Sequence, residues 1–226
     1  MIALAIDLSS PQGSLALFHD REVIGSSCWR QHRNDGQALF REWPMLLQQN
    51  GVRPDQIQLY IFGRGPGAFS GLRMSLSSAQ AAALPHQARV YSISSGEAIA
   101  AEVVRKHAVQ SVVVVGNARR NKIWLGQFSI TGEGRLHLPD GWELTGPNEL
   151  LAQCNGTNRF VSPHFDQLRQ VLPAEALAGD RWIADNQWPH AVEVGRAAIQ
   201  HIADGDPTEP LSPLYLHAPV ATTTPC

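Results

Sequence analysis

A glycine-rich segment at residues 63–73, GRGPGAFSGLR, sets the strictest limits on the local backbone of this chain. It follows an apolar run at 59–62 and precedes a helical pattern at 72–84. Glycines permit positive φ and close backbone approach, and the helix N-terminus beyond them offers free N–H groups to an anion. The phosphate-binding pattern GxxxxGKS/T is absent, and Ala68 or Ser70 takes the last glycine place of GxGxxG. These motifs alone therefore favour a tight strand-to-helix turn in which the glycines serve packing.

Apolar periodicity predicts strands and helices along most of the chain. Residues 2–6 are continuously apolar, which indicates an inner strand, and residues 14–18 and 22–29 have the pattern of a hairpin. Residues 37–49 form an amphipathic helical pattern, in which Pro44 can introduce a kink. Further strands are expected at 59–62, 89–93, 111–115, 122–130, 136–144 and 159–161, and further helices at 72–84, 96–106, 165–171 and 190–203, with a short one opening at 146–149.

This order of elements predicts an α/β protein with two lobes of related design, because each half begins with strands and continues with helices. We expect an N-terminal lobe at 1–108 and a smaller C-terminal lobe at 109–206. Residues 207–226 hold five of the 15 prolines and are expected to form an extended peripheral segment.

The charge balance argues against a chain that holds nucleic acid by itself, because 18 Lys and Arg face 20 Asp and Glu, a net charge of −2.

The three cysteines, Cys28, Cys154 and Cys226, are far apart and encode neither a disulfide framework nor a thiolate zinc site, which favours a reducing compartment. No apolar run approaches the ~18 residues that span a bilayer, and no basic segment precedes the apolar N-terminus as in a signal peptide. We therefore expect a cytoplasmic protein with no membrane partner.

Four segments of the chain match one set of motifs in order and spacing. They are residues 63–73, already quoted, LAIDLS at 4–9, NARRNKIW at 117–124 and PLYLH at 213–217. These segments resemble the GxGPGSFTGxR, LAIDTS, DARRxEVY and PxYLR motifs of the TsaB (YeaZ) family, a bacterial component of tRNA threonylcarbamoyladenosine synthesis. The chain is identified as a divergent member, because it departs from these motifs at Asn117, Asn121-Lys122 and His217. An early His-Thr/Ser motif of the family is also reduced to His32-Arg33.

The resemblance implies the actin/Hsp70/sugar-kinase ATPase-like fold, with two ribonuclease-H-like lobes, and a non-catalytic role. In this family TsaB pairs with TsaD, which transfers the threonylcarbamoyl group to adenosine 37 of tRNA, and the ATPase TsaE is a third component. The chain is then a scaffold that binds no cofactor itself, since ATP and a metal belong to the partner enzymes. Its expected partners are a TsaD homologue, a TsaE homologue and a second copy of the chain, with tRNA reached only through the complex.

The resemblance also places the partner surface on the first-lobe helices at 37–49 and 72–84, with Trp43 as a contact on the first. Small side chains at spacings of three and four residues let a facing helix come close. On the second helix this small-residue stripe consists of Ser75, Ser78, Ala79 and Ala82. The alternative is that the stripe packs against the chain's own sheet.

An ATP-dependent small-molecule kinase or nucleotide hydrolase of the same fold is the alternative function, and a self-associating regulatory protein is a third. Such enzymes orient Mg²⁺ with carboxylates at equivalent strand ends of the two lobes, and here that pair is Asp7 and Asn117. A neutral amide cannot supply the second charge, so we expect no independent ATPase activity, and Asp7 is expected to cap backbone N–H groups. No two of the nine histidines are four residues apart, so the metal-binding pair of the catalytic paralogue is missing and no metal site is expected.

The roles of Ser70, of a cationic cluster and of the glycine-rich turn remain to be considered. Ser70 lacks the glycine that a nucleophile elbow requires two residues before it, and we expect Ser70 to be a helix N-cap. Arg119, Arg120 and Lys122 form a compact cationic cluster, which either contacts the tRNA backbone or is a solvated loop. The candidate residues of the glycine-rich turn are Gly63, Gly65, Gly67, Gly71 and Arg73.

Overall fold

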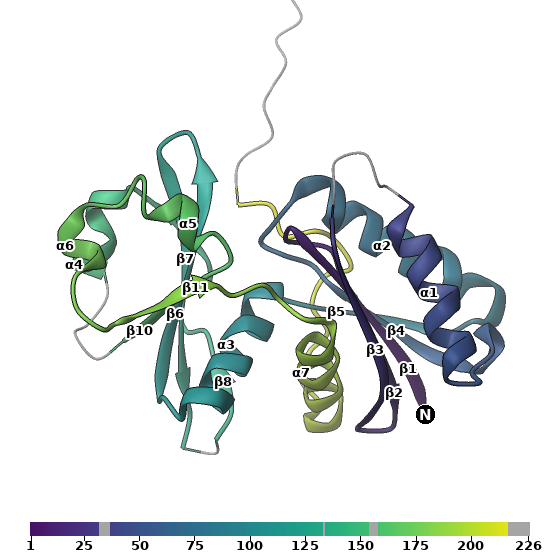
Figure 1. Ribbon diagram of the computed structural model, residues 1–226. Coiled ribbons are helices and arrows are strands. Elements are labelled where there is room, and N and C mark those ends of the chain that lie inside the picture. Colours follow the sequence, from purple (N-terminus) through teal and green to yellow (C-terminus); the bar gives the residue numbers. More distant parts are fainter. Residues whose placement is uncertain (32–36, 133, 154–157, 217–226) are drawn as a thin grey trace, which may run out of the picture.

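A computed structural model describes residues 1–31, 37–132, 134–153 and 158–216 of the chain. These residues form two lobes that lie side by side, each built on one β-sheet with helices on its faces (Figure 1). Within this part of the chain no helix has both the length and the apolar character needed to cross a membrane.

The first sheet has the strand order β3-β2-β1-β4-β5. Strand β1 lies in its centre, antiparallel to β2 and parallel to β4, which is why its apolar residues are buried on both faces as predicted. The five strands are β1 (Ile2–Asp7), β2 (Gln12–His19), β3 (Glu22–Arg30), β4 (Ile57–Gly63) and β5 (Arg89–Ile93).

Helices cover both faces of this sheet (Figure 1). Helices α1 (Ala38–Gln49) and α2 (Phe69–Ala83) pack on one face, and α7 (Ala191–Asp204) packs on the other. Pro44 lies inside α1. Short 3₁₀ turns follow the first two helices, at Pro54–Gln56 and Leu84–His86.

The second sheet has the order β11-β10-β6-β7-β8, and β9 also pairs with β7. Helix α3 covers one face, while three short helices pack on the other (Figure 1). The strands are β6 (Ser111–Arg119), β7 (Lys122–Ile130), β8 (Leu136–His137), β9 (Glu143–Thr145), β10 (Arg159–Ser162) and β11 (Trp182–Asn186). The helices are α3 (Ser95–His107), α4 (Leu150–Gln153), α5 (Phe165–Leu168) and α6 (Ala174–Leu177), with a 3₁₀ turn at Pro147–Glu149.

Several expected boundaries in the second half are wrong. The strand expected at 136–144 is two short strands, β8 and β9, which both pair with β7. Pro139 and the left-handed Gly141, at φ +72°, interrupt the strand between them. The helix expected at 165–171 ends at Leu168. Strand β11 and helix α6 were not expected.

Helices α3 and α7 pack together between the two sheets. Arg105 Nη2 lies 2.6 Å from Glu193 Oε1, and His201 Nε2 lies 2.7 Å from Glu97 Oε1, so ion pairs join the two helices. The expected α/β fold of two ribonuclease-H-like lobes is confirmed by this architecture. The division at residues 108 and 206 stays a prediction, although α7, which follows the second sheet in the chain, packs on the first.

Candidate functional site

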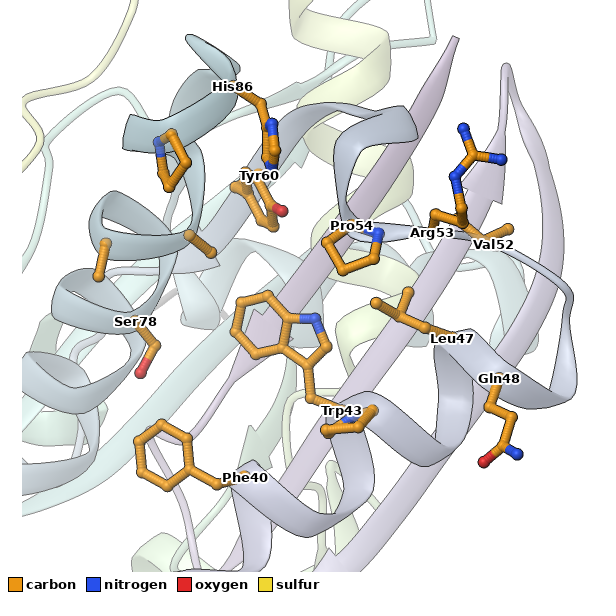
Figure 2. Close-up of a pocket in the computed structure, with 14 residues that line it drawn as sticks. Phe40, Trp43, Leu47, Gln48, Val52, Arg53, Pro54, Tyr60, Ser78 and His86 are labelled. Carbon is orange, nitrogen blue, oxygen red and sulfur yellow. The ribbon is translucent and has the colours of Figure 1, made fainter.

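An apolar groove of about 700 Å³ runs between α1 and α2 on the first lobe (Figure 2). Both helices line it, together with the turns that follow them and the strand β4 beneath. The residues that line it include Phe40, Trp43, Tyr60, Ser78, Ala82 and His86.

Trp43 lies in the middle of this groove (Figure 2). Its indole is half-buried, with its centroid 5.7 Å from that of the buried Tyr60 ring, while Phe40 is 59% exposed at the rim. Clustered, partly exposed aromatic side chains are typical of protein-binding surfaces. Phe40 was not among the expected interface residues, because helical spacing does not show which edge of an apolar stripe faces solvent.

The small-residue stripe on α2 divides between the core and the groove. Ser75 and Ala79 have exposed fractions of 0%, which corrects the expectation that they face a partner. They pack toward the chain's own sheet because α2 buries the face that carries Leu72, Ser75 and Ala79. Ser78 and Ala82 do line the groove, so the interface prediction is restricted to these two residues and Trp43.

The glycine-rich turn packs tightly on the loop that follows β1. The N–H of Ala68 donates to the carbonyl oxygen of Ser9 at 2.7 Å. A Cβ at position 67 would overlap Ser9, and one at position 71 would overlap the carbonyl oxygen of Leu8. The glycines therefore act through close backbone approach, which is the packing role that the motif itself favoured.

The ends of the turn are fixed by polar contacts. Gly65 has φ +106°, its N–H donates to Ser95 Oγ at 3.1 Å, and its carbonyl accepts from Ser94 Oγ at 3.0 Å. Arg64 pairs with Glu209 of the C-terminal segment and donates from Nε to the carbonyl of Ser212 at 3.1 Å. The segment at 207–216 thus covers the turn.

Ser70 and Arg73, in the last part of the glycine-rich segment, lie in the first turns of α2. The N-cap of α2 is Ala68, so the expectation that Ser70 is the N-cap is wrong. The Arg73 guanidinium lies 5.2 Å from the centre of the Phe69 ring, which stacks on Tyr215 with centroids 5.1 Å apart.

Asp7 is enclosed at the end of β1. Ser95 Oγ donates to Oδ2 at 2.6 Å, and the hydroxyl and N–H of Ser9 donate to Oδ1 at 2.7 and 2.9 Å. Burial raises the pKa of the Asp7 carboxyl from 3.8 to about 6, although these hydrogen bonds oppose the shift. Because a Cβ on the neighbouring Gly63 would overlap the carboxylate, the packing leaves no room for an ion on that side. The expected cap role of Asp7 agrees with its bond to the Ser9 N–H.

We predict that, because of this buried carboxyl, the free energy of unfolding falls as the pH rises. The folded state binds the Asp7 proton more tightly than the unfolded chain, so the stabilisation is complete below pH 3.8 and is lost as the pH rises through about 6. Asp7→Asn should remove this slope, which corresponds to a difference on the order of 2–3 kcal/mol between pH 4 and pH 8. Urea unfolding at several pH values measures it, with the exposed Asp140→Asn as control. Equal pH slopes for the wild type and Asp7→Asn would contradict the prediction.

Asn117, at the end of β6, has different neighbours from Asp7. Its side-chain amide donates to Gln167 Oε1 at 3.1 Å, its Oδ1 accepts from the Arg119 N–H at 2.8 Å, and its N–H donates to His164 Nδ1 at 3.2 Å. Asp7 and Asn117 share no hydrogen-bond partner among the residues described, and their proposed equivalence stays a prediction. No group of three or more His, Cys, Asp or Glu in that part of the chain is placed to hold a metal ion.

A model of the family "TsaD: tRNA N6-adenosine threonylcarbamoyltransferase" matches residues 26–140, which is 115 of the 226 residues. The chain is also similar to the tRNA threonylcarbamoyladenosine biosynthesis protein TsaB of Escherichia coli, with 27% identity over 98% of this chain and 96% of the relative. TsaB of Haemophilus influenzae is 30% identical over 55% of this chain, an alignment that spans about half (52%) of that relative. Among solved structures, YeaZ from Pseudomonas aeruginosa has the same fold, with a TM-score of 0.78, 24% identity and coverage of 95% of this chain and 99% of its own.

Proposed function

The chain belongs to the TsaB (YeaZ) family, within the wider family of the TsaD model, and from this membership we propose that it is a non-catalytic partner subunit of a TsaD homologue in threonylcarbamoyladenosine synthesis. In this role it supports the transfer of the threonylcarbamoyl group to adenosine 37 of tRNA in the cytoplasm. A TsaE homologue joins the same assembly, the partner enzymes bind ATP and the metal, and tRNA is reached through the complex.

The groove between α1 and α2 is the observation that carries this proposal. The match to the TsaD family covers residues 26–140, which include both helices, so a TsaD partner has counterparts of α1 and α2. Two related helix pairs can pack face to face about a pseudo-twofold axis, as identical surfaces do in symmetric dimers. Trp43 and Phe40 supply the aromatic centre that such interfaces use. A second copy of the chain carries the same helices and competes for the same groove.

The surroundings of Asp7 favour an accessory role over the kinase or hydrolase alternative. The carboxylate accepts hydrogen bonds from Ser9 and Ser95 and is fully buried. An enzyme of that class needs a strand-end carboxylate that reaches hydrated Mg²⁺ and phosphate. Asp7 is instead part of the packing between β1 and the glycine-rich turn.

Co-purification tests the proposal directly. The full chain and the TsaD homologue of its own organism are expressed together, with an affinity tag on the TsaD homologue only, and analysed by size-exclusion chromatography. We expect the two proteins to elute as one complex at micromolar concentration. Separate elution of two folded proteins, with folding checked by circular dichroism, would contradict the proposed partnership.

A further inference from the structure

The turn between β6 and β7 displays a cluster of exposed cations. The basic turn, defined as Arg119, Arg120 and Lys122, is exposed at all three positions. None of these side chains forms an ion pair with any carboxylate of residues 1–31, 37–132, 134–153 and 158–216. Many other basic side chains in the same part of the chain do pair, among them Arg53, Arg64, Lys106 and Arg196. Unpaired neighbouring cations repel one another, so the arrangement is favourable only when an anion joins it.

The backbone holds this turn in a conformation that costs free energy. Arg119, Arg120 and Asn121 follow one another with φ values of +64°, +51° and +54°, a region that side chains other than glycine rarely adopt. The Asn117 side chain accepts the Arg119 N–H at 2.8 Å, and the pairing of β6 with β7 shifts register at this point. The hydrogen bond from the Arg119 N–H to Asn117 Oδ1 and the pairing of β6 with β7 thus support the turn in this conformation.

The groups beneath the basic turn are neutral. The Asn117 amide bonds to Gln167, and its N–H donates to His164 Nδ1 at 3.2 Å. Burial, followed by the nearby charge of Arg119, lowers the pKa of His164 to about 4, so this ring carries no charge near pH 7. Among the described residues, no carboxylate forms an ion pair with Arg119 or Arg120 that would compete with an external anion.

We propose that the basic turn binds the phosphodiester backbone of RNA, within the assembly named under the proposed function. Guanidinium groups bind phosphate oxygens in a bidentate manner, and such contacts are independent of base sequence. A protein partner is less well matched, because the apolar residues that follow, Ile123 and Trp124, are buried and leave the tip without an apolar centre. Three cations on a chain of net charge −2 bind RNA only weakly by themselves and add to the affinity of a complex that also holds RNA elsewhere.

The inference rests on the proposed function, and a titration of the complex tests it. An unmodified tRNA transcript is titrated with the complex of the chain and its TsaD homologue, at several KCl concentrations, by fluorescence anisotropy. The variant Arg119→Gln/Arg120→Gln removes two cations, and Arg21→Gln/Arg89→Gln removes two exposed cations on the other lobe. We expect about a tenfold weaker Kd for the first variant, a salt slope lower by roughly 1–2, and wild-type values for the second.

Each other outcome has a defined reading. Equal Kd and slope in wild type and Arg119→Gln/Arg120→Gln would overturn the inference, as would equal losses in both variants. Loss of co-purification with the TsaD homologue in the first variant would show a protein contact and also overturn it. Loss of ATP binding by the complex that carries Arg119→Gln/Arg120→Gln, measured by calorimetry while tRNA binding stays intact, would show that the turn contacts nucleotide phosphates. That result would also overturn the inference. If the wild-type chain itself fails to co-purify, the proposed function fails, and the same titration on the full chain alone, where the variant must still lower the affinity, decides the RNA inference.

Discussion

Replacing Gly71 by valine is expected to prevent stable folding of the first lobe. Any Cβ at this position overlaps the carbonyl oxygen of Leu8, and that backbone cannot easily retreat because the adjacent Ser9 carbonyl accepts the Ala68 N–H. A β-branched side chain adds further bulk at the same point. We expect a loss of at least about 3 kcal/mol in the free energy of unfolding, a large part of the stability of an ordinary domain.

Gly132→Val provides the matched control. Nothing lies within 4 Å of a Cβ at position 132, and the residue is exposed. This substitution should change stability by no more than about 0.5 kcal/mol. Thermal and urea unfolding of both proteins measure the difference, and a Gly71→Val protein as stable as Gly132→Val would refute the account of the glycine-rich turn.

Ala82→Arg is expected to abolish association with the TsaD homologue while the chain stays folded. Ala82 lines the groove and is only partly buried, so an arginine can extend along the groove instead of entering the core. There it fills the space that a partner helix needs and places a charge in an apolar contact. We expect the Kd for the TsaD homologue to rise more than a hundredfold, which is the size of effect seen at interface centres.

Ser77→Arg carries the same change to a neighbouring position of α2 that is exposed and lies outside the groove. It should bind the TsaD homologue like the wild type. Calorimetric titration gives both affinities, and circular dichroism confirms that each variant is folded. Wild-type affinity in Ala82→Arg would exclude the groove as the partner surface, and unfolding of Ala82→Arg would show that position 82 belongs to the core.

The sequence predicted best where one local rule determines the structure. The apolar run at 2–6 became the central strand because a strand covered on both faces buries successive residues, as at residues 3–6. Gly67 and Gly71 of the turn approach the backbone of Ser9 and Leu8 closely, as glycine-rich spacing between a strand and a helix suggests. These features depend on short stretches of chain.

Features set by packing between distant segments were harder to predict. Ser75 and Ala79 share one face of α2 with Leu72, and spacing alone cannot tell whether a small-residue face meets the sheet or a partner. The pairing of Arg64 with Glu209 joins residues 145 positions apart, and nothing local in either segment indicates it. The basic turn was visible as a charge cluster, but the left-handed backbone at Arg119, Arg120 and Asn121 and the absence of ion pairs within the described part of the chain needed coordinates.

The central claim is that this chain supports tRNA threonylcarbamoylation by presenting the groove between α1 and α2 to its partner. The level of the modified nucleoside in tRNA tests this claim most directly. The amount of threonylcarbamoyladenosine in total tRNA is measured by mass spectrometry in cells of the source organism that lack the chain and carry wild type, Ser77→Arg or Ala82→Arg. We predict wild-type levels with the first two and a level as low as in the deletion strain with Ala82→Arg. A normal level in the deletion strain would contradict the function, and a normal level with Ala82→Arg would contradict the role of the groove.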